Sequence, residues 1–321
     1  MPDDWATQFT QEALAKVDAF IAQHRDYTRR GVEQPGQGAT NRVMFARRGE
    51  GLVVFKVFCT VDRKERECFA LRHWRETGLV PELICDVDER MIVMSHVPGV
   101  SLHDARGTDG EATWRRACRE VGRATGSLTR VPLGDADRAA FEARFYDGLA
   151  ALGPYLNRII ELGRSIHARD PDFRGDFWRD SLDFIDAELP GIVAQPHALY
   201  DQDVGNLHVQ RGRFSGFFDL EMCRVGGPAM QLASAIGMLN GDLAAWEPFR
   251  HGWEAATERP LILPDRCAAA AAKHLLCWRE ISRYLSYDGT PGTGYAWADP
   301  ADPVRYRTAI KAAENLFEIG R

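Results

Sequence analysis

In the first hundred residues, short apolar runs typical of strands alternate with two stretches at helical spacing. After residue 100, helical spacing dominates. Apolar residues at helical spacing begin the chain, and two apolar runs then flank the turn at 47–51. A second helical stretch ends at a glycine, and two further short apolar runs follow it. The pattern predicts helix, strand, strand, helix, strand and strand over residues 5–24, 43–45, 52–58, 63–77, 82–87 and 91–97.

Long helical segments dominate the chain beyond residue 100, with one β-like interruption at 197–219. Helices are predicted over 111–130, 137–151, 154–168, 173–188, 228–239, 242–256, 264–286 and 303–318. The fold class is therefore predicted to be α+β, with a small β-rich part before a larger helical part. The boundaries are 1–94 for the first part, 95–100 for a hinge and 101–321 for the second.

Composition narrows the class of protein. The 321 residues are 45% hydrophobic and 27% charged, which is typical of a globular enzyme. Lys and Arg number 40 against 46 Asp and Glu, so the net charge of −6 argues against nucleic acid as a partner. No apolar run reaches the roughly 18 residues of a membrane span. The seven cysteines form no C-x-x-C pair, so reduced thiols and a cytoplasmic location are expected.

Carboxylates and an amide cluster in the β-like interruption. Asp201 and Asn206 lie five residues apart on a glycine-containing loop, and Asp219 ends a second apolar run. Two hairpin-like segments, 207–210 and 214–218, would fold Asp219 back beside Asn206. Carboxylate and amide oxygens of this kind suit Mg²⁺. The spacing therefore predicts a magnesium-binding corner at the mouth of a β-ribbon.

These residues carry a resemblance to a known family. Asp201, Asn206, Asp219, Gly226 and Pro228 fall on the patterns His-Gly-Asp-x-x-x-x-Asn and Ile-Asp-x-x-x-x-x-x-Gly-Asp-Pro. The chain thus resembles the aminoglycoside phosphotransferase and choline-kinase-like family. The resemblance implies a two-lobed protein-kinase-like fold and ATP-dependent phosphorylation of a small-molecule hydroxyl. In such a site Asp201 orients or deprotonates the acceptor, while Asn206 and Asp219 hold Mg²⁺.

A glycine-rich loop before the first strand resembles the family's phosphate-covering loop. Gly36, Gly38 and Thr40 belong to it, and glycines let backbone amides approach phosphate oxygens without a Cβ clash. No G-x-x-x-x-G-K-[ST] pattern occurs, which excludes the P-loop nucleotide hydrolases. A dinucleotide-binding site would need a third glycine where Asn41 stands, and a helix after it.

Lys56 is a charge inside an apolar strand, where a lone lysine is costly unless it is paired. It could reach water from the edge of the strand. By the resemblance it would instead contact the α- and β-phosphates, held by a glutamate of the next helix. Glu67 fits best, because Ala70 and Leu71 share its helical face, and Glu65 is the competing choice.

The segment 93–102 resembles the family's hinge, which reads L-V-M-E-Y-V-P-G-x-x-L. By the resemblance, the Ser95 carbonyl and the Val97 amide would read an adenine, and Phe218 beside Asp219 joins the nucleotide-binding set. Glu221 could approach the metal site or bind the acceptor, and Asp203 could face a cationic acceptor, although a solvated loop carboxylate is an equal alternative.

Several positions depart from the family's pattern. Leu199 and Tyr200 replace His-Gly, Gly227 replaces an Asp, and Gln231 stands where a second Asp is usual. These departures leave a nucleotide-binding regulatory pseudokinase as the alternative function. A protein kinase is third, because no Ala-Pro-Glu segment follows Asp219. The acceptor is left open among aminoglycoside-like and other antibiotics and hydroxylated metabolites, and so is the oligomeric state.

Overall fold

The computed structural model describes most of the chain. The described residues are 2–36, 40–146, 149, 151–201, 205–239, 242–286 and 302–319. Within them, no helix combines the length and the apolar character that crossing a membrane requires. Two predicted site residues, Gly38 and Asp203, lie outside the described residues.

The chain divides into two compact units at Val97 and Pro98. The first includes Met1–Val97, and the second includes Pro98–Ser286 and the C-terminal helix. The first is a β-sheet with two helices, and the second is mainly helical. This confirms the α+β prediction.

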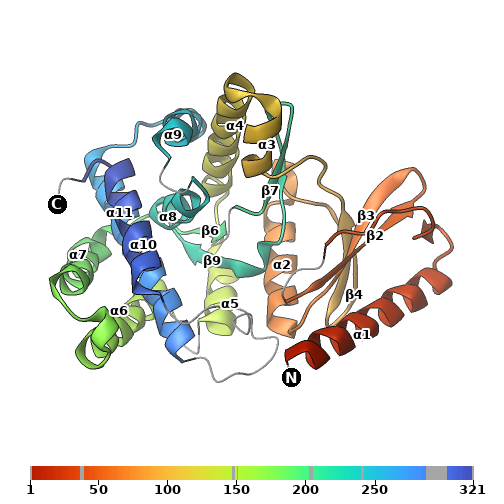
Figure 1. Cartoon of the computed structure of the whole chain (residues 1–321), viewed down its shortest axis with the longest axis horizontal. Helices are drawn as coiled ribbons and strands as arrows, with labels where there is room; N and C mark the ends of the chain where they lie inside the picture. The colour runs from red at the N-terminus through yellow and green to blue at the C-terminus, as the bar shows by residue number, and fades with distance from the viewer. Residues whose placement is uncertain are drawn as a thin grey trace. The chain divides into compact units, whose positions relative to one another are not determined.

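The sheet of the first unit has five antiparallel strands in the order β1-β2-β3-β5-β4 (Figure 1). A two-residue turn at Gly49 and Glu50 joins the second strand to the third, and Gly49 has a φ of +60°. This left-handed backbone favours glycine. The strands are β1 (Tyr27–Thr28), β2 (Arg42–Arg48), β3 (Gly51–Val57), β4 (Leu83–Asp88) and β5 (Met91–Ser95).

The two faces of this sheet carry different side chains, because successive residues of a strand point to opposite faces. Val53, Phe55 and Val57 of β3 are buried in one apolar cluster with Phe9 and Val17 of helix α1 (Pro2–Gln23). Lys56 has the opposite parity and therefore belongs to the other face. That face is where helix α2 (Val61–His73) contributes its buried residues.

The second unit contains nine helices and two short β-ribbons among its described residues. The ribbons pair β6 (Ala198–Asp201) with β9 (Cys223–Gly226), and β7 (Leu207–Gln210) with β8 (Arg213–Phe217). The helices are α3 (Leu102–Asp109), α4 (Glu111–Thr129), α5 (Asp135–Phe145), α6 (Leu152–Arg169), α7 (Asp176–Val193), α8 (Pro228–Leu239), α9 (Leu243–Thr257), α10 (Leu263–Leu285) and α11 (Pro303–Leu316).

Helix α10 is the central helix of this unit and packs against α6, α7, α8 and α11 (Figure 1). Its five consecutive alanines, 268–272, are all buried, and their small side chains let the neighbouring helices approach closely. Further along, Trp278 meets Trp178 of α7 edge to face, with ring centroids 5.4 Å apart. This geometry is favourable for aromatic pairs.

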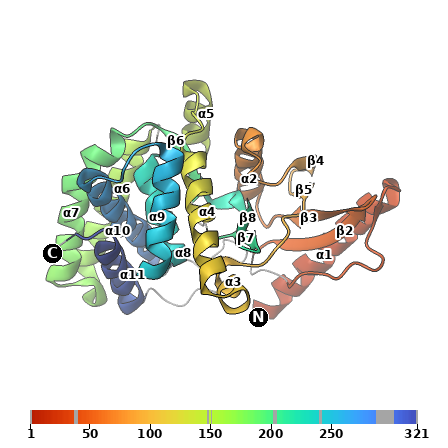
Figure 2. The ribbon, with the colours of Figure 1, turned by 90° about the horizontal axis from the view of Figure 1, so that it is seen from above.

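Helices α4 and α9 cross at van der Waals contact of their backbones (Figure 2). A Cβ built on Gly122 would lie 2.0 Å from the carbonyl oxygen of Phe249, and one built on Gly252 would lie 2.0 Å from that of Arg119. No side chain fits in these gaps. The crossing therefore depends on glycine from both helices.

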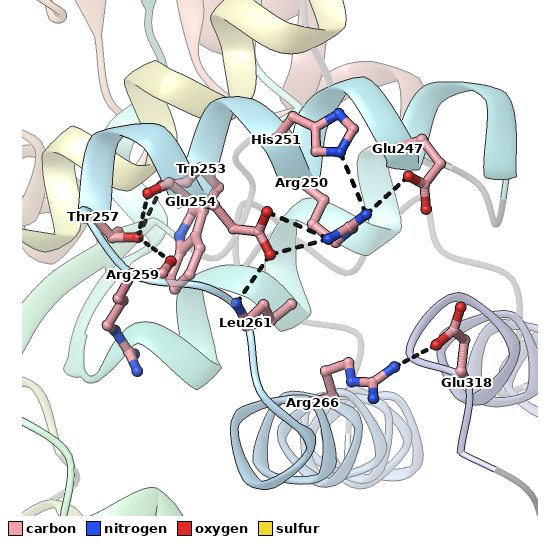
Figure 3. A network of polar contacts seen from close by, with 10 residues as sticks. All are labelled: Glu247, Arg250, His251, Trp253, Glu254, Thr257, Arg259, Leu261, Arg266 and Glu318. Carbon is pink, nitrogen blue, oxygen red and sulfur yellow. Dashed lines mark hydrogen bonds and ion pairs between the residues drawn. The ribbon is translucent and has the colours of Figure 1, made fainter.

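A polar network closes the corner between α9 and α10 (Figure 3). The Glu254 carboxylate accepts hydrogen bonds from Arg250 and from the backbone N–H of Leu261, both at 3.0 Å. Arg250 also donates to Glu247 at 3.0 Å. Glu254 thus ties the end of α9 to the chain that leads into α10.

A second polar network is buried between α7, α10 and α11. The Ser181 hydroxyl accepts from the Trp278 indole at 3.2 Å and forms a second hydrogen bond, of 3.0 Å, with Nδ1 of His274. Glu314 lies 3.4 Å from Nε2 of His274 and 2.6 Å from the Lys311 ammonium. Burial raises the pKa of Glu314, but His274 and Lys311 outweigh it and bring the value down to about 2.

Several predicted boundaries are wrong. Helix α5 ends at Phe145 rather than at residue 151, and α7 runs from Asp176 to Val193 rather than over 173–188. Helix α7 continues through Pro190, which a sequence pattern reads as a stop. Helix α3 and strand β9 were not predicted, because both are short and β9 pairs with β6, which lies beyond the intervening hairpin in the sequence.

Replacing Gly252 with alanine tests the α4–α9 crossing. Gly252→Ala should lower the free energy of unfolding by about 1–3 kcal/mol, because the new methyl group forces the backbones apart. Urea denaturation measures this loss. Gly191→Ala is the matched control, since an added Cβ at this exposed helical position meets nothing within 4 Å. It should be neutral or stabilising by about 0.5–1 kcal/mol.

Acid titration tests the Glu314 network. The folded pKa of about 2 lies below the ordinary value of 4.5, so the stabilisation is fully present above about pH 4.5 and is lost as pH falls toward 2. Glu314→Gln should flatten the fall of unfolding free energy between pH 5 and pH 3. Glu318→Gln, which removes an exposed partner of Arg266, should leave that slope unchanged. Equal slopes in all three proteins would contradict the assignment.

Candidate functional site

Lys56 and Glu67 form a buried ion pair in the first unit. Lys56 is 2% exposed and Glu67 is fully buried, and the lysine ammonium donates to the glutamate carboxylate. The Lys56 ammonium also lies 4.8 Å from the centre of the Phe58 ring. Glu65 is only partly buried. Of the two candidate partners, the structure therefore pairs Lys56 with Glu67.

The predicted phosphate-covering loop is described only at its ends, Gly36 and Thr40. Arg63 of α2 lies 3.4 Å from the Thr40 hydroxyl. The Asn41 side chain accepts from the backbone N–H of Cys59 at 3.2 Å, which ties the start of β2 to the end of β3. The predicted loop is therefore attached to a strand pair, β2 and β3, that these contacts fix in place.

Backbone hydrogen bonds position the predicted adenine-reading segment. The Ser95 N–H donates to the Glu82 carbonyl at 2.9 Å, and the Ser95 hydroxyl accepts from the Glu82 N–H at 2.9 Å. The His96 N–H donates to Leu52 at 3.3 Å. These contacts hold Ser95 and His96 against the neighbouring strands. Val97 follows them as the last residue of the first unit. Adenine recognition by Ser95 and Val97 remains a prediction.

The first β-ribbon of the second unit carries Asp201. Asp201 is the last residue of β6, pairs with Cys223 of β9, and is 1% exposed. Its backbone N–H donates to the side-chain oxygen of Gln231 at 3.3 Å. A strand end and a helix side chain together fix the backbone of Asp201.

The second β-ribbon brings Asn206 and Asp219 together, as the hairpin spacing predicts. Leu207 pairs with Phe217, and the Phe218 N–H donates to the Asn206 carbonyl at 2.9 Å. The Phe218 ring meets His208 edge to face, with centroids 4.7 Å apart. Asn206 therefore lies across the ribbon from the residue that precedes Asp219.

Asp219 has a backbone conformation that is rare for a side-chain-bearing residue. Its φ of 59° and ψ of 48° are left-handed, a region that costs of order 1–3 kcal/mol and is enriched at functional sites. The bend turns the chain into a 3-10 helix, Leu220–Met222. Carboxylate oxygens of Asp219 and the buried Glu221 lie within 4.8 Å of each other. Their separation and hard oxygen chemistry suit a divalent cation such as Mg²⁺.

The start of the second unit is tied directly to this ribbon. Val100 exchanges two backbone hydrogen bonds with Val209 of β7, at 3.0 and 2.8 Å. Gly99 has a φ of +119°, and a Cβ there would lie 2.4 Å from the Val209 carbonyl oxygen. Only glycine permits this approach. The Gly99–Val100 half of the predicted hinge is therefore fixed to β7.

Tyr200 and Gln231, which both differ from the family's pattern, support Asp201. Tyr200 is 2% exposed, and a Cβ on Gly226 would lie 2.8 Å from its ring. Tyr200 therefore fills the space that glycine leaves on the opposite strand. Gln231 still provides an oxygen that accepts the Asp201 N–H. Sequence reasoning noted both departures but missed these supporting roles.

Arg224 was missed altogether, although it lies at the base of the site. It stands opposite Tyr200 in the β6–β9 ribbon and is 2% exposed. Burial lowers the pKa of its guanidinium, and the positive charge of Arg279 lowers it further. The signal in the sequence was a single charged residue, Arg224, between the apolar residues Cys223 and Val225.

Breaking the Lys56–Glu67 pair tests its burial. Lys56→Met and Glu67→Met should each lower the free energy of unfolding by about 3–5 kcal/mol, because each leaves one uncompensated buried charge. The double variant should lose less than the sum, as measured by urea denaturation. Asp176→Ala, which breaks an exposed pair with Arg179, should change stability by about 0–1 kcal/mol. Additive single losses would show that the two charges do not interact.

Comparison with protein families gives a match over most of the chain. Residues 31–270 match the profile described as the phosphotransferase enzyme family. A search of curated proteins gives no match.

Solved structures with the same fold are phosphotransferases of low sequence identity. Aminoglycoside phosphotransferase APH(4)-Ia is 15% identical, with a TM-score of 0.64 over 97% of this chain and 100% of that one. ADP-bound APH(2'')-Ib is 13% identical, with a TM-score of 0.58 over 94% and 98%. Macrolide 2'-phosphotransferase MphH from Brachybacterium faecium is 17% identical, with a TM-score of 0.58 over 95% and 98%. The chain therefore has the two-lobed kinase-like fold.

Proposed function

Because the chain belongs to the phosphotransferase enzyme family, we propose that it transfers the γ-phosphoryl group of ATP to a hydroxyl of a small molecule. The acceptor oxygen forms a new P–O bond while the bond from the γ-phosphorus to ADP breaks. The hydroxyl proton passes to Asp201. The reaction needs no other co-reactant.

The observation that carries this proposal is the buried Lys56–Glu67 ion pair. A buried ion pair is often no more stabilising than apolar residues of the same volume, so the fold alone does not require one. A lysine with a fixed ammonium group can hold the α- and β-phosphates of a nucleotide. Gly36, Gly38 and Thr40 are the proposed loop over those phosphates, and Ser95, Val97 and Phe218 are proposed for the adenine.

The cation site proposed for Mg²⁺ consists of Asn206 and Asp219. The closeness of the Asp219 and Glu221 carboxylates supports this assignment, and it adds Glu221 as a possible third oxygen ligand. Magnesium bound there would neutralise phosphate charge during transfer. The left-handed backbone of Asp219 sets the direction in which this carboxylate leaves the chain.

Asp201 is the proposed catalytic residue. Catalysis in such sites is mainly positioning and charge stabilisation, so the carboxylate needs a fixed direction more than an unusual acidity. The strand pairing of Asp201 and the hydrogen bond from its N–H to Gln231 fix the backbone from which this carboxylate leaves the chain. A fixed backbone at this position supports an active enzyme over the alternative, a regulatory pseudokinase.

Antibiotics are the first acceptors to test. A mutant of APH(4)-Ia was solved in a ternary complex with AMP-PNP and hygromycin B, and MphH is a macrolide phosphotransferase. The antibiotics that these two structures are described with support a hydroxylated small molecule as the acceptor. Asp203 and Glu221 are the acceptor-site candidates from the sequence.

Two substitutions separate the acceptor residue from the metal residue. Asp201→Asn should keep Mg·ATP binding in a thermal-shift assay and lose turnover by ~10²–10⁴-fold, the usual contribution of a general base. Asp219→Asn should lose both, because it removes charge at the metal. Steady-state turnover on a confirmed acceptor completes the comparison.

Each outcome has a clear consequence. Full turnover by Asp201→Asn would remove Asp201 from the chemistry and make Asp203 the next candidate. If the unaltered protein binds Mg·ATP but phosphorylates nothing in a broad acceptor panel, the pseudokinase interpretation is favoured instead.

A further inference from the structure

A cavity of about 520 Å³ in the second unit reaches the loop that carries Asn206. Helices α8, α10 and α11 form its walls, and Gly205, the neighbour of Asn206, lines one end. This volume is in the range of small-molecule sites. The cavity is therefore a candidate for the acceptor site.

Charged side chains from two helices line this cavity. Lys273, Cys277 and Glu280 lie at i, i+4 and i+7 of α10, so they share one face of the helix. Arg305 joins them from the first turn of α11. Two cations and one anion give the wall a net charge of 2 − 1 = +1.

These charges do not neutralise one another. Within the described part of the chain, Lys273, Glu280 and Arg305 form no hydrogen bond or ion pair. The Arg305 guanidinium lies 5.9 Å from the centre of the Tyr306 ring. Burial raises the pKa of the Cys277 thiol to about 11, so that side chain adds no charge at neutral pH. The wall thus keeps its charges available to a ligand.

Tyr306 lines the same wall. The side chain is 3% exposed, and its buried hydroxyl has no hydrogen-bond partner among the described residues. Burial raises the pKa of Tyr306 far above its ordinary value, so the hydroxyl keeps its proton. A buried hydroxyl group of this kind is unfavourable unless a ligand or water completes it.

A further positive charge lies in the second unit. Arg224 is buried in the ribbon that ends at Asp201. Among the described residues, its Nε has no hydrogen-bond partner and its guanidinium donates only to the Cys223 carbonyl, at 3.4 Å. No carboxylate among the described residues pairs with Arg224, and the charge that acts on it most strongly is that of Arg279. The ribbon that carries Asp201 therefore contains a buried positive charge.

We propose that the acceptor is a hydroxylated small molecule with an anionic group, a carboxylate or a phosphate. Lys273 and Arg305 bind the anionic group, and Glu280 accepts a hydrogen bond from a hydroxyl or ammonium of the same molecule. The acceptor hydroxyl then lies toward Gly205 and the loop that follows Asp201. This inference rests on the proposed phosphotransferase function and narrows its acceptor class.

Matched acceptors test the charge preference. Gluconate, glycerate and glycerol 3-phosphate are compared with gluconamide, glyceramide and glycerol, and glucosamine is the cationic member. ADP release measures turnover, and calorimetry measures binding separately. For at least one pair, the anion should have a kcat/KM roughly 10- to 100-fold higher than the neutral partner, the range expected of charge-assisted hydrogen bonds. Which anion is preferred distinguishes a carboxylate from a phosphate.

Substitutions assign the preference to the cavity. Arg305→Gln and Lys273→Met should raise KM for the anion by roughly 10-fold or more, with little change in kcat or in KM for ATP. Arg307→Gln is the matched control, because Arg307 is exposed on the same helix and stacks on Phe177 instead. It should leave all constants unchanged.

The outcomes separate this inference from the proposed function. Preferential turnover of neutral or cationic acceptors overturns the inference and keeps the phosphotransferase function. The same holds if Arg305→Gln and Lys273→Met behave like Arg307→Gln. If anions bind in an Arg305-dependent manner but no acceptor is phosphorylated, the anion site stands and the phosphotransferase function fails. Absence of both binding and turnover for every anion overturns the inference.

Discussion

The pairing of β6 with β9 is the constraint on which the second half of the candidate site depends. Asp201 and Cys223 are direct partners in this ribbon, and Asn206, Asp219 and Glu221 all lie in the loop between them. The β7–β8 hairpin nests inside the same loop and joins Phe218 to Asn206. Backbone hydrogen bonds therefore bring these oxygen-bearing residues together, largely independently of the side chains next to them.

This dependence on the backbone explains how the departures from the family's pattern can be accommodated. Tyr200 is large, but Gly226 on the facing strand leaves room for its ring. Gln231 has no charge, but its oxygen still accepts the Asp201 N–H. Both changes preserve the backbone position of Asp201 while they alter its electrostatic surroundings. The family's aspartate at position 231 would add a negative charge beside Asp201. In this chain that charge is absent, and the buried charge on strand β9 is the positive one of Arg224.

Local spacing made part of this structure predictable. The hairpin that joins Asn206 to Asp219 follows from two short apolar runs, and the Glu67 partner of Lys56 follows from the apolar face of one helix. Other features depend on contacts between distant residues. Strand β9 exists because β6 lies beside it, and the α4–α9 crossing needs glycines 130 residues apart, at 122 and 252. The left-handed backbone of Asp219 and the cavity wall formed by α10 and α11 cannot be predicted from the residue pattern of any one segment.

Helix α10 shows how one element can serve both the core and the cavity proposed for the acceptor. A run of small buried residues, Ala268–Ala272, allows close helix packing and carries no charge. The residues that follow this run carry charge in different directions, with Lys273 and Glu280 toward the cavity and Arg279 close enough to lower the pKa of Arg224. Because the core contacts and the charged wall use different residues, changes at Lys273 or Glu280 leave the alanine packing intact. Under the proposed function, acceptor preference can therefore vary on this helix without loss of the fold.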